Sequence, residues 1–279
     1  MTKTALLAAL MAMSSTATAQ ITYTPSASDH LGFYLGAQVW QSDVSGDFGE
    51  TNQRLDFHLK KQQQFNSFVA VNHPYPFLPN VRIAHTTLAT TGQTTLTQAF
   101  SFQDKTFAAA DTVEANFQLS YVDYSFSYAL YDHTNAFVAL GLTLRDLHGD
   151  VAIGKASDAS DNTCNDPNPS PDRPCNDDLS SSIGQIKANK IKPMLNIAGS
   201  VKVPATNINV FANADILVMA NDTFADYQLG FSVDLLKTNL GQWQLNLGYR
   251  VVNLEFEDLN SLATELAFQG AFVGTVARF

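Results

Sequence analysis

The chain has 279 residues, of which 45% are hydrophobic and 15% are charged, and its net charge is −10 at pH 7. An acidic chain of this kind is not expected to bind nucleic acid, whose phosphates need a basic surface. After residue 19, no stretch holds the roughly 18 consecutive apolar residues that a transmembrane helix needs, so a helical membrane protein is excluded too.

The first expected element is a secretory signal peptide over residues 1–19. Lys3 gives it a positive start, an apolar core follows, and Ala17-Thr18-Ala19 supplies the small residues that signal peptidase recognises. Cleavage after Ala19 leaves residues 20–279 as one folded domain.

Composition indicates the class of that domain. The chain carries 19 Phe, 9 Tyr and 2 Trp, and its mean hydropathy is only −0.06. In a transmembrane β-barrel, each strand turns one face to lipid and the other to a polar lumen, so the two contributions cancel. We therefore expect an all-β protein, a transmembrane antiparallel up-and-down barrel.

Apolar and polar residues alternate with a period of two in several segments, which indicates β-strands. In residues 224–236, apolar side chains such as Tyr227, Leu229 and Phe231 alternate with polar ones such as Gln228 and Ser232. A helix would scatter these residues around its surface, whereas a strand separates them. The same alternation recurs in residues 208–218 and 242–251. A soluble β-sandwich with one wet face is the alternative.

About ten strands are expected. They lie near residues 32–42, 64–73, 80–92, 112–130, 135–154, 186–203, 207–219, 224–236, 242–257 and 263–279. Residues 93–111 could add a further pair, which makes twelve strands the alternative. The alternation slips around 121–124 and 251–254, where we expect β-bulges.

The connections should alternate between short and long, with both chain ends on the periplasmic side. The compact set is 74–80, 131–135, 203–206 and 237–241, and the opposite set includes the long connections 43–63 and 155–185. The long acidic segment 155–185 is therefore expected to be an extracellular loop. It contains Cys164 and Cys175, which should pair in an oxidising compartment.

The chain ends in a strand that closes on Phe279. The assembly machinery of outer-membrane barrels recognises a terminal strand with a glycine and a hydrophobic residue at set distances from a final aromatic. Gly274, Ala277 and Phe279 resemble that signal.

The chain also resembles a functionally uncharacterised family of Gram-negative outer-membrane β-barrels that has a proline-rich His-Pro turn after strand two. The residues that carry the resemblance are His73-Pro74-Tyr75-Pro76-Phe77-Leu78-Pro79-Asn80, Val122-Asp123, Tyr128, Leu130, Asp132, Gly141-Leu142, Gly248-Tyr249-Arg250, Gly270-Ala271-Phe272 and Phe279. The resemblance covers the whole mature chain and implies location and fold, but no established activity.

Within the His-Pro stretch, His73, Pro74, Pro76 and Pro79 predict a rigid periplasmic turn, because proline fixes φ and removes a donor. A docking surface for a periplasmic partner is the functional alternative to a purely structural turn.

Ionisable residues in the polar phase of the strands are the candidates for lining the lumen. They are Arg145, Asp215, Asp226, Asp234 and Arg250. Asp226 and Asp234 are about 27 Å apart along one strand, too far to share a site. We expect Asp226 near the outer mouth, with Asp215 and Arg250 at intermediate depth. These charges either form a salt-bridged plug or tune a narrow pore.

A hydrolase at the outer rim is a weaker hypothesis. It rests on His148 between Asp146 and Asp150, and on His58 with Asp56. The first hypothesis for the function is that the protein is a non-enzymatic barrel, either structural or weakly pore-forming, without a cofactor or metal. A surface-binding barrel that acts through the acidic loop is the alternative. The expected partners are outer-membrane lipid, lipopolysaccharide and the barrel-assembly machinery.

Overall fold

A computed structural model describes residues 31–50, 53–75, 77–133, 135–156, 183–219, 222–238, 241–259 and 262–279. Within these ranges no helix has the length and apolar character needed to cross a membrane. The expected signal peptide, Pro76, the two cysteines and most of the acidic loop lie outside the described residues.

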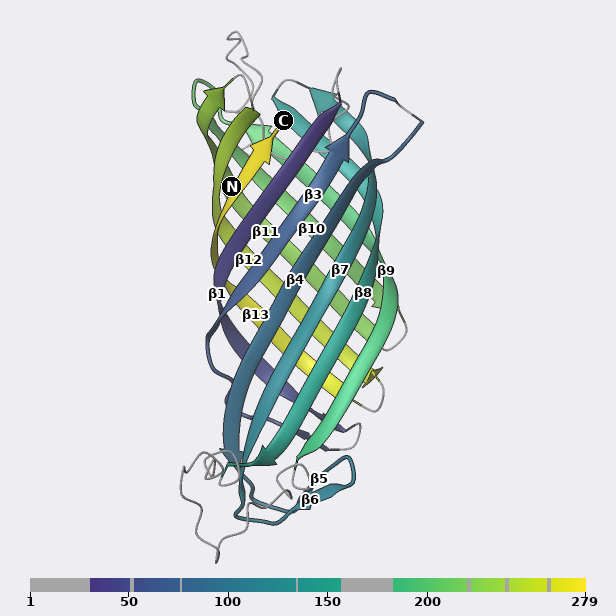
Figure 1. The fold of residues 1–279 in the computed structure, drawn as a ribbon, viewed down its shortest axis with the longest axis vertical. Coiled ribbons are helices and arrows are strands. Elements are labelled where there is room, and N and C mark those ends of the chain that lie inside the picture. Colours follow the sequence, from purple (N-terminus) through teal and green to yellow (C-terminus); the bar gives the residue numbers. More distant parts are fainter. Residues whose placement is uncertain are drawn as a thin grey trace, which may run out of the picture.

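Ten long antiparallel strands form a closed barrel in the described part of the chain (Figure 1). They are β1 (Gly32–Glu50), β3 (Gln62–Asn72), β4 (Asn80–Thr95), β7 (Thr112–His133), β8 (Ala136–Lys155), β9 (Gly184–Lys202), β10 (Ile208–Met219), β11 (Asp222–Thr238), β12 (Gly241–Leu259) and β13 (Leu262–Arg278). Each strand pairs with the next along the chain, and β13 pairs with β1 to close the barrel. The expected up-and-down barrel of ten strands is confirmed.

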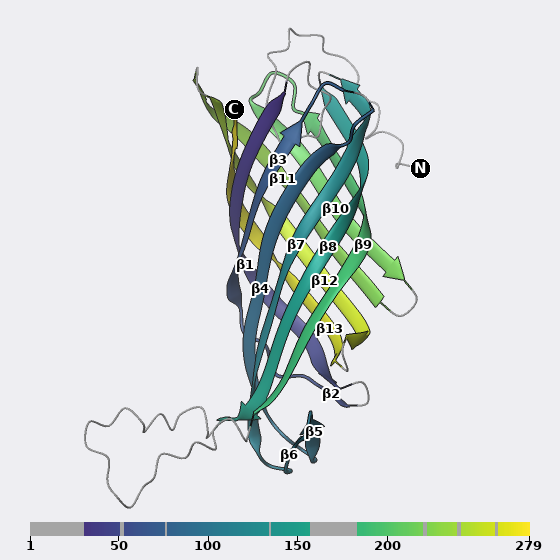
Figure 2. The ribbon, with the colours of Figure 1, turned by 45° about the vertical axis from the view of Figure 1, so that its right-hand side comes forward.

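We call the end of the barrel where β1 begins and β13 ends the terminal end, and the other the distal end. Residues 93–111, the candidates for two further barrel strands, do not add strands to the barrel. β4 continues to Thr95, and the rest forms a small hairpin at the distal end, β5 (Phe100–Phe102) with β6 (Lys105–Phe107) (Figure 2). The short strand β2 (Gln53–Leu55) pairs with the last residues of β1. The twelve-strand alternative is therefore wrong.

The bulges expected at 121–124 and 251–254 are also absent from the described strands. The β7–β8 pairing runs without interruption from Tyr121 to Tyr124, and β12 keeps its register from Val251 to Leu254. Register shifts occur elsewhere, for example between Ala129 and Tyr131. The alternation slips for another reason, which is that the polarity of the two faces inverts.

β7 shows this inversion most clearly. In its first half the inward side chains are buried and apolar, namely Val113, Ala115, Phe117, Leu119 and Tyr121. In its second half they are buried and polar, namely Asp123, Ser125 and Ser127. The outward side chains change in the opposite sense, from Glu114, Asn116, Gln118 and Ser120 to Val122, Tyr124, Phe126, Tyr128 and Leu130.

Other strands invert at the same level. On β8, the outward residues Leu140, Leu142 and Leu144 give way to Asp146, His148 and Asp150. On β12, the inward residue Arg250 is followed by Val252 and Leu254. The barrel thus has a terminal half with an apolar outside and a mainly polar inside, which also holds two small apolar clusters, and a distal half with a polar outside and an apolar inside.

The distal half is filled by one aromatic core. Phe48, Phe57, Phe117 and Phe268 are at most 3% exposed, and Phe48 stacks on Phe57 with ring centroids 4.8 Å apart. The β5–β6 hairpin adds Phe100, Phe102 and Phe107 to the same cluster.

Polar contacts fasten the hairpin to the barrel rim. The backbone N–H of Ser101 donates to Gln53, and that of Gln103 donates to Glu50 at 2.6 Å. The hairpin is therefore a cap whose apolar side completes the distal core.

The inversion of polarity predicts that replacing a phenylalanine by alanine on β7 lowers the free energy of unfolding by different amounts at an inward and an outward position. Phe117→Ala should lower the free energy of unfolding by about 3–5 kcal/mol, because it opens a cavity in the distal core. Phe126→Ala, on the outward face of the same strand, should cost considerably less. Urea titration of the refolded barrel, followed by tryptophan fluorescence, measures both. Equal costs would contradict the assigned faces.

Candidate functional site

Two arginines and three aspartates meet inside the barrel at the level where its polarity inverts. We call this group the ionic layer; it comprises Asp123 of β7, Arg145 of β8, Asp215 of β10, Asp226 of β11 and Arg250 of β12. All five residues are at most 8% exposed. Strand pairing explains part of the arrangement, because Asp123 lies directly opposite Arg145 in the β7–β8 ladder.

Arg145 joins two parts of the layer. Its Nε and Nη2 donate to the two carboxylate oxygens of Asp123 at 2.6 and 2.8 Å, and Nη2 also reaches Asp226 at 3.1 Å. Such a bidentate contact uses the planar fork of the guanidinium, which a lysine could not reproduce.

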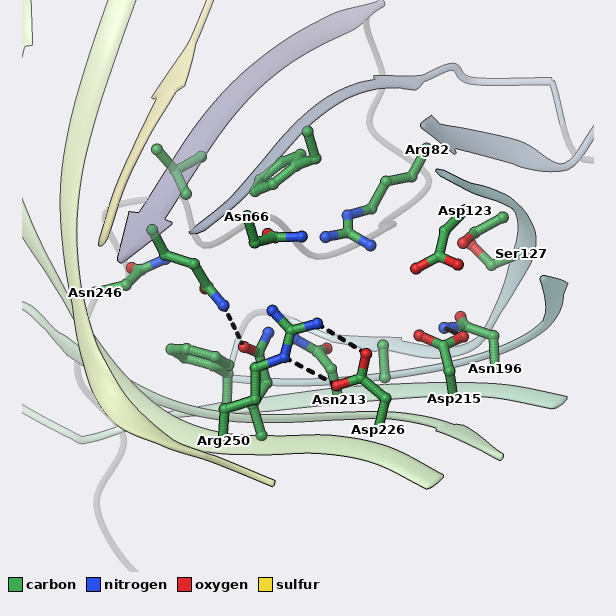
Figure 3. A pocket seen from close by; sticks show the side chains of 17 residues that line it. Asn66, Arg82, Asp123, Ser127, Asn196, Asn213, Asp215, Asp226, Asn246 and Arg250 are labelled. Atoms are coloured by element: carbon green, nitrogen blue, oxygen red, sulfur yellow. Dashed lines mark hydrogen bonds and ion pairs between the residues drawn. The ribbon is translucent and has the colours of Figure 1, made fainter. Parts of the chain in front are cut away.

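Arg250 holds Asp226 from the other side. Its Nε and Nη2 donate to the two oxygens of Asp226 at 2.9 and 2.8 Å (Figure 3). Asp226 therefore lies between two arginines, and its carboxylate also accepts a hydrogen bond of 2.8 Å from the Tyr121 hydroxyl.

Asp215 lies directly opposite Asp226 in the β10–β11 ladder. Like charges at opposed positions are destabilising unless other groups neutralise them. Asp215 accepts hydrogen bonds from Thr143 at 2.7 Å and from Asn196 at 2.9 Å, and Arg145 Nη2 lies 4.0 Å away. These donors make the close approach of the two carboxylates possible.

On its distal side the ionic layer meets the aromatic core. The Arg145 guanidinium lies 3.9 Å from the centroid of the Tyr121 ring and 4.4 Å from that of Phe224, and Arg250 lies 5.3 Å from the Trp40 ring. Cations over aromatic faces are favourable when desolvated. The arginines thus contact apolar rings on one side and carboxylates on the other.

On its terminal side the layer borders a polar cavity of about 80 Å³. Figure 3 shows Arg82 and Asn66 on the wall facing Arg250 and Asp226. The lining also includes the carboxamides of Gln38, Asn196, Asn213, Gln228 and Asn246. A polar space of this size has room for several water molecules, which would satisfy groups such as the buried Asn246 oxygen that has no protein partner.

The sequence had indicated five lumen residues, and the structure brings four of them together. Asp234 lies apart from the layer, where its carboxylate accepts a hydrogen bond of 2.6 Å from Gln244. The separation of Asp226 from Asp234 is as expected. The expectation that Asp226 lies nearer the outer mouth than Arg250 and Asp215 is wrong, because these three residues belong to one layer.

Sequence reasoning missed two members of the site. In the sequence, Tyr121 and Asp123 mark only a slip in the alternation, and Asp123 is also among the residues that carry the family resemblance. That slip was the available signal, since a buried aspartate two residues from a buried tyrosine marks the inversion itself.

Residues 73–75 and 77–79 lie at the terminal end, in the turn between β3 and β4. His73 closes it through Nε2, which is 3.1 Å from the Pro79 carbonyl oxygen.

The residues of the expected assembly signal are in the last strand. Gly274 pairs with Gln38 across the closing seam, Ala277 is buried, and Phe279 is largely exposed beyond the end of β13.

The candidate hydrolase residues make two contacts with one another. Asp146, His148 and Asp150 point outward on β8, and His148 Nδ1 is 3.9 Å from Asp146. Asp56 accepts a hydrogen bond from the backbone N–H of His58 rather than from its ring. No group of three potential metal ligands occurs among the residues that the structure describes.

No protein-family model matches the chain, and no curated protein matches it. Solved structures that match the fold include the outer membrane protease OmpT from Escherichia coli. The match has a TM-score of 0.46 and 10% identity, and it covers 93% of this chain and 98% of that one. They also include Ail, the attachment invasion locus protein of Yersinia pestis, solved with the heparin analogue sucrose octasulfate, with a TM-score of 0.36, 10% identity, and coverage of 90% and 99%. The toluene transporter TodX of Pseudomonas putida matches with a TM-score of 0.28, 8% identity, and coverage of 89% of each chain.

The contacts in the ionic layer predict that neutralising the Asp226 carboxylate strongly lowers the free energy of unfolding. Asp226→Asn should lower the free energy of unfolding by about 3–5 kcal/mol, because it leaves two buried arginines short of a carboxylate. Asp234→Asn on the same strand removes a charge but keeps an oxygen that can accept the hydrogen bond from Gln244, so it should cost no more than about 1 kcal/mol. Urea titration of both variants provides the comparison. Similar losses of unfolding free energy in the two variants would show that the buried contacts of Asp226 with the two arginines do not control stability.

Proposed function

We propose that this protein is a sealed outer-membrane barrel without enzymatic activity, which is anchored by its terminal half and displays its distal half outside the membrane. The observation that carries this proposal is the inversion of polarity at the ionic layer. An apolar outer face over a polar interior suits lipid, whereas a polar outer face over an apolar core suits water.

The apolar part of the outer face has the dimensions of a membrane belt. On β7 it runs from Val122 to Leu130 and includes the exposed side chains of Tyr124, Phe126 and Tyr128. Eight residue steps span about 27 Å along the strand, or roughly 20 Å along the axis at the usual tilt of such barrels. That height approaches the apolar band of about 25 Å found in outer-membrane barrels.

The strands are longer than such a band requires. β7 has 22 residues. Its length is therefore roughly 70 Å along the strand and about 55 Å along the axis. About half of the barrel extends beyond the belt, and this half carries Glu114, Gln118, His148 and Asp150 on its outside.

The connections support the orientation. At the terminal end, β7 and β8 are joined by residues 134–135 and β11 and β12 by residues 239–240. At the distal end, residues 96–111 and 156–183 form the longest links, whereas β10 and β11 are joined there by residues 220–221 and β12 and β13 by residues 260–261. Outer-membrane barrels have short periplasmic turns and longer external loops. The distal end, with the acidic segment, is thus the external end in this proposal.

The interior favours the structural role over a narrow pore. The ionic layer, the distal aromatic core and the β5–β6 cap occupy successive levels of the barrel. The polar cavity lies on the terminal side of the layer, and the apolar side chains beyond it give ions no hydrated path. Membrane lipid, lipopolysaccharide and the assembly machinery are the partners that this role implies.

A surface-binding role is the second candidate. A groove of about 360 Å³ runs over the outside of the distal half, with Gln118, Ser120, His148, Asp150 and Lys187 among the residues of its lining. In this proposal the groove lies outside the membrane, where it would be open to a ligand. A binding role through the acidic loop 155–185 stays a prediction.

The sealed interior predicts an absence of conductance. In planar bilayers, the purified refolded protein should give no steady single-channel steps, and Arg250→Gln should destabilise the barrel rather than change an ion selectivity. Recordings paired with heat-modifiability gels test both statements. Regular conductance steps from the folded form would refute the sealed barrel and favour the pore.

The membrane belt predicts a difference between two outward positions of β7. Phe126→Arg should lower the free energy of unfolding in lipid vesicles by about 2–4 kcal/mol, because it places a charge in the middle of the belt. Gln118→Arg lies in the projecting half and should change stability by no more than about 0.5 kcal/mol. Equal effects in a urea titration would mean that the belt is misplaced.

A further inference from the structure

The turn between β3 and β4 presents an exposed apolar tip. Its side chains are Tyr75, Phe77 and Leu78, which are 66%, 90% and 57% exposed. We call these three residues the turn tip. No charged residue lies between His73 and Asn80. An uncharged aromatic group held open to the surroundings needs an explanation beyond the reversal of the chain.

His73 makes the turn rigid. Its Nε2 is 3.1 Å from the Pro79 carbonyl oxygen, and its Nδ1 accepts a hydrogen bond of 3.2 Å from the backbone N–H of Tyr75. One ring therefore ties both sides of the turn together. The N–H of Leu78 donates to the carbonyl of Tyr75 at 3.3 Å, which closes the turn beneath the tip. Because the turn is already rigid, binding of a ligand at the tip would cost little further conformational entropy.

A second contact fixes the direction in which the tip leans. The Tyr128 hydroxyl donates to the carbonyl oxygen of Phe77 at 3.3 Å. Tyr128 is an outward residue of β7 and belongs to the apolar belt. The turn therefore folds toward the outer wall of the barrel, and its tip continues the belt at the terminal end instead of covering the lumen.

We propose that the turn tip binds phospholipid at the boundary between headgroups and acyl chains, on the leaflet that faces the terminal end. This inference rests on the proposed membrane orientation and adds an anchoring site to it. Aromatic side chains are favoured at this boundary, where the ring of a tyrosine contacts acyl chains and its hydroxyl stays hydrated. The continuity of the tip with the belt favours lipid over a periplasmic protein.

Tryptophan fluorescence in vesicles of brominated phosphatidylcholine can test the site. The native Trp243 is replaced by Phe, and Trp40, which is 1% exposed inside the barrel, remains as a constant background. Phe77→Trp then reports on the tip, and Tyr75→Trp is a second reporter. We expect blue-shifted emission that lipid brominated near the top of the acyl chain quenches more strongly than lipid brominated near its end.

Two control variants distinguish a failure of the proposed lipid site from a failure of the proposed membrane orientation. Leu229→Trp lies in the apolar belt of β11 and should be quenched more by bromine near the end of the chain. Pro204→Trp, in the exposed β9–β10 turn at the same end of the barrel, should emit as in water. If Leu229→Trp is quenched while both tip reporters emit as in water, the tip is not a lipid site. If Leu229→Trp is itself not quenched, the membrane orientation fails. Quenching of Pro204→Trp equal to that of the tip would also overturn the assignment.

Discussion

The contact of Asp226 with Arg145 and Arg250 is the interaction on which the rest of the barrel depends. These three charges are at most 6% exposed, so each is stable only because the others neutralise it. They come from β8, β11 and β12, and the contact therefore constrains the register of the strands between them. A slip of β12 by one residue would turn Arg250 to the outer face and leave Asp226 with one arginine instead of two.

The ionic layer also separates two interiors with different solvent requirements. Toward the terminal end, carboxamides and Arg82 surround a cavity with room for water, and the outer face is apolar. Toward the distal end, aromatic rings fill the interior and the outer face is polar. The arginines suit this boundary, since a guanidinium can lie over Tyr121 or Trp40 while its edge donates to a carboxylate. The proposed membrane position follows from this boundary.

The strand number and the closed barrel could be predicted from sequence, because a period of two and short turn segments depend on local chemistry. The inversion of polarity could not be predicted, and the two positions where it occurs are interpreted from sequence as β-bulges. At 121–124, an apolar side chain appears in the expected polar phase, and a local irregularity explains this as well as an inversion does. The interpretation assumed that each strand face keeps one polarity along its length. Strands that extend beyond a membrane do not satisfy that assumption.

The sequence by itself determined which side chains share a strand face, and therefore that Arg145, Asp215, Asp226 and Arg250 point inward. Only the tertiary structure decided which of them meet. Arg145 and Asp226 are 81 residues apart and lie on strands that are not neighbours. Their depths depend on the tilt and stagger of the whole closed sheet, which no single strand encodes. For the same reason, counting residues along β11 misplaced Asp226, and Asp123 was not identified as the partner of Arg145.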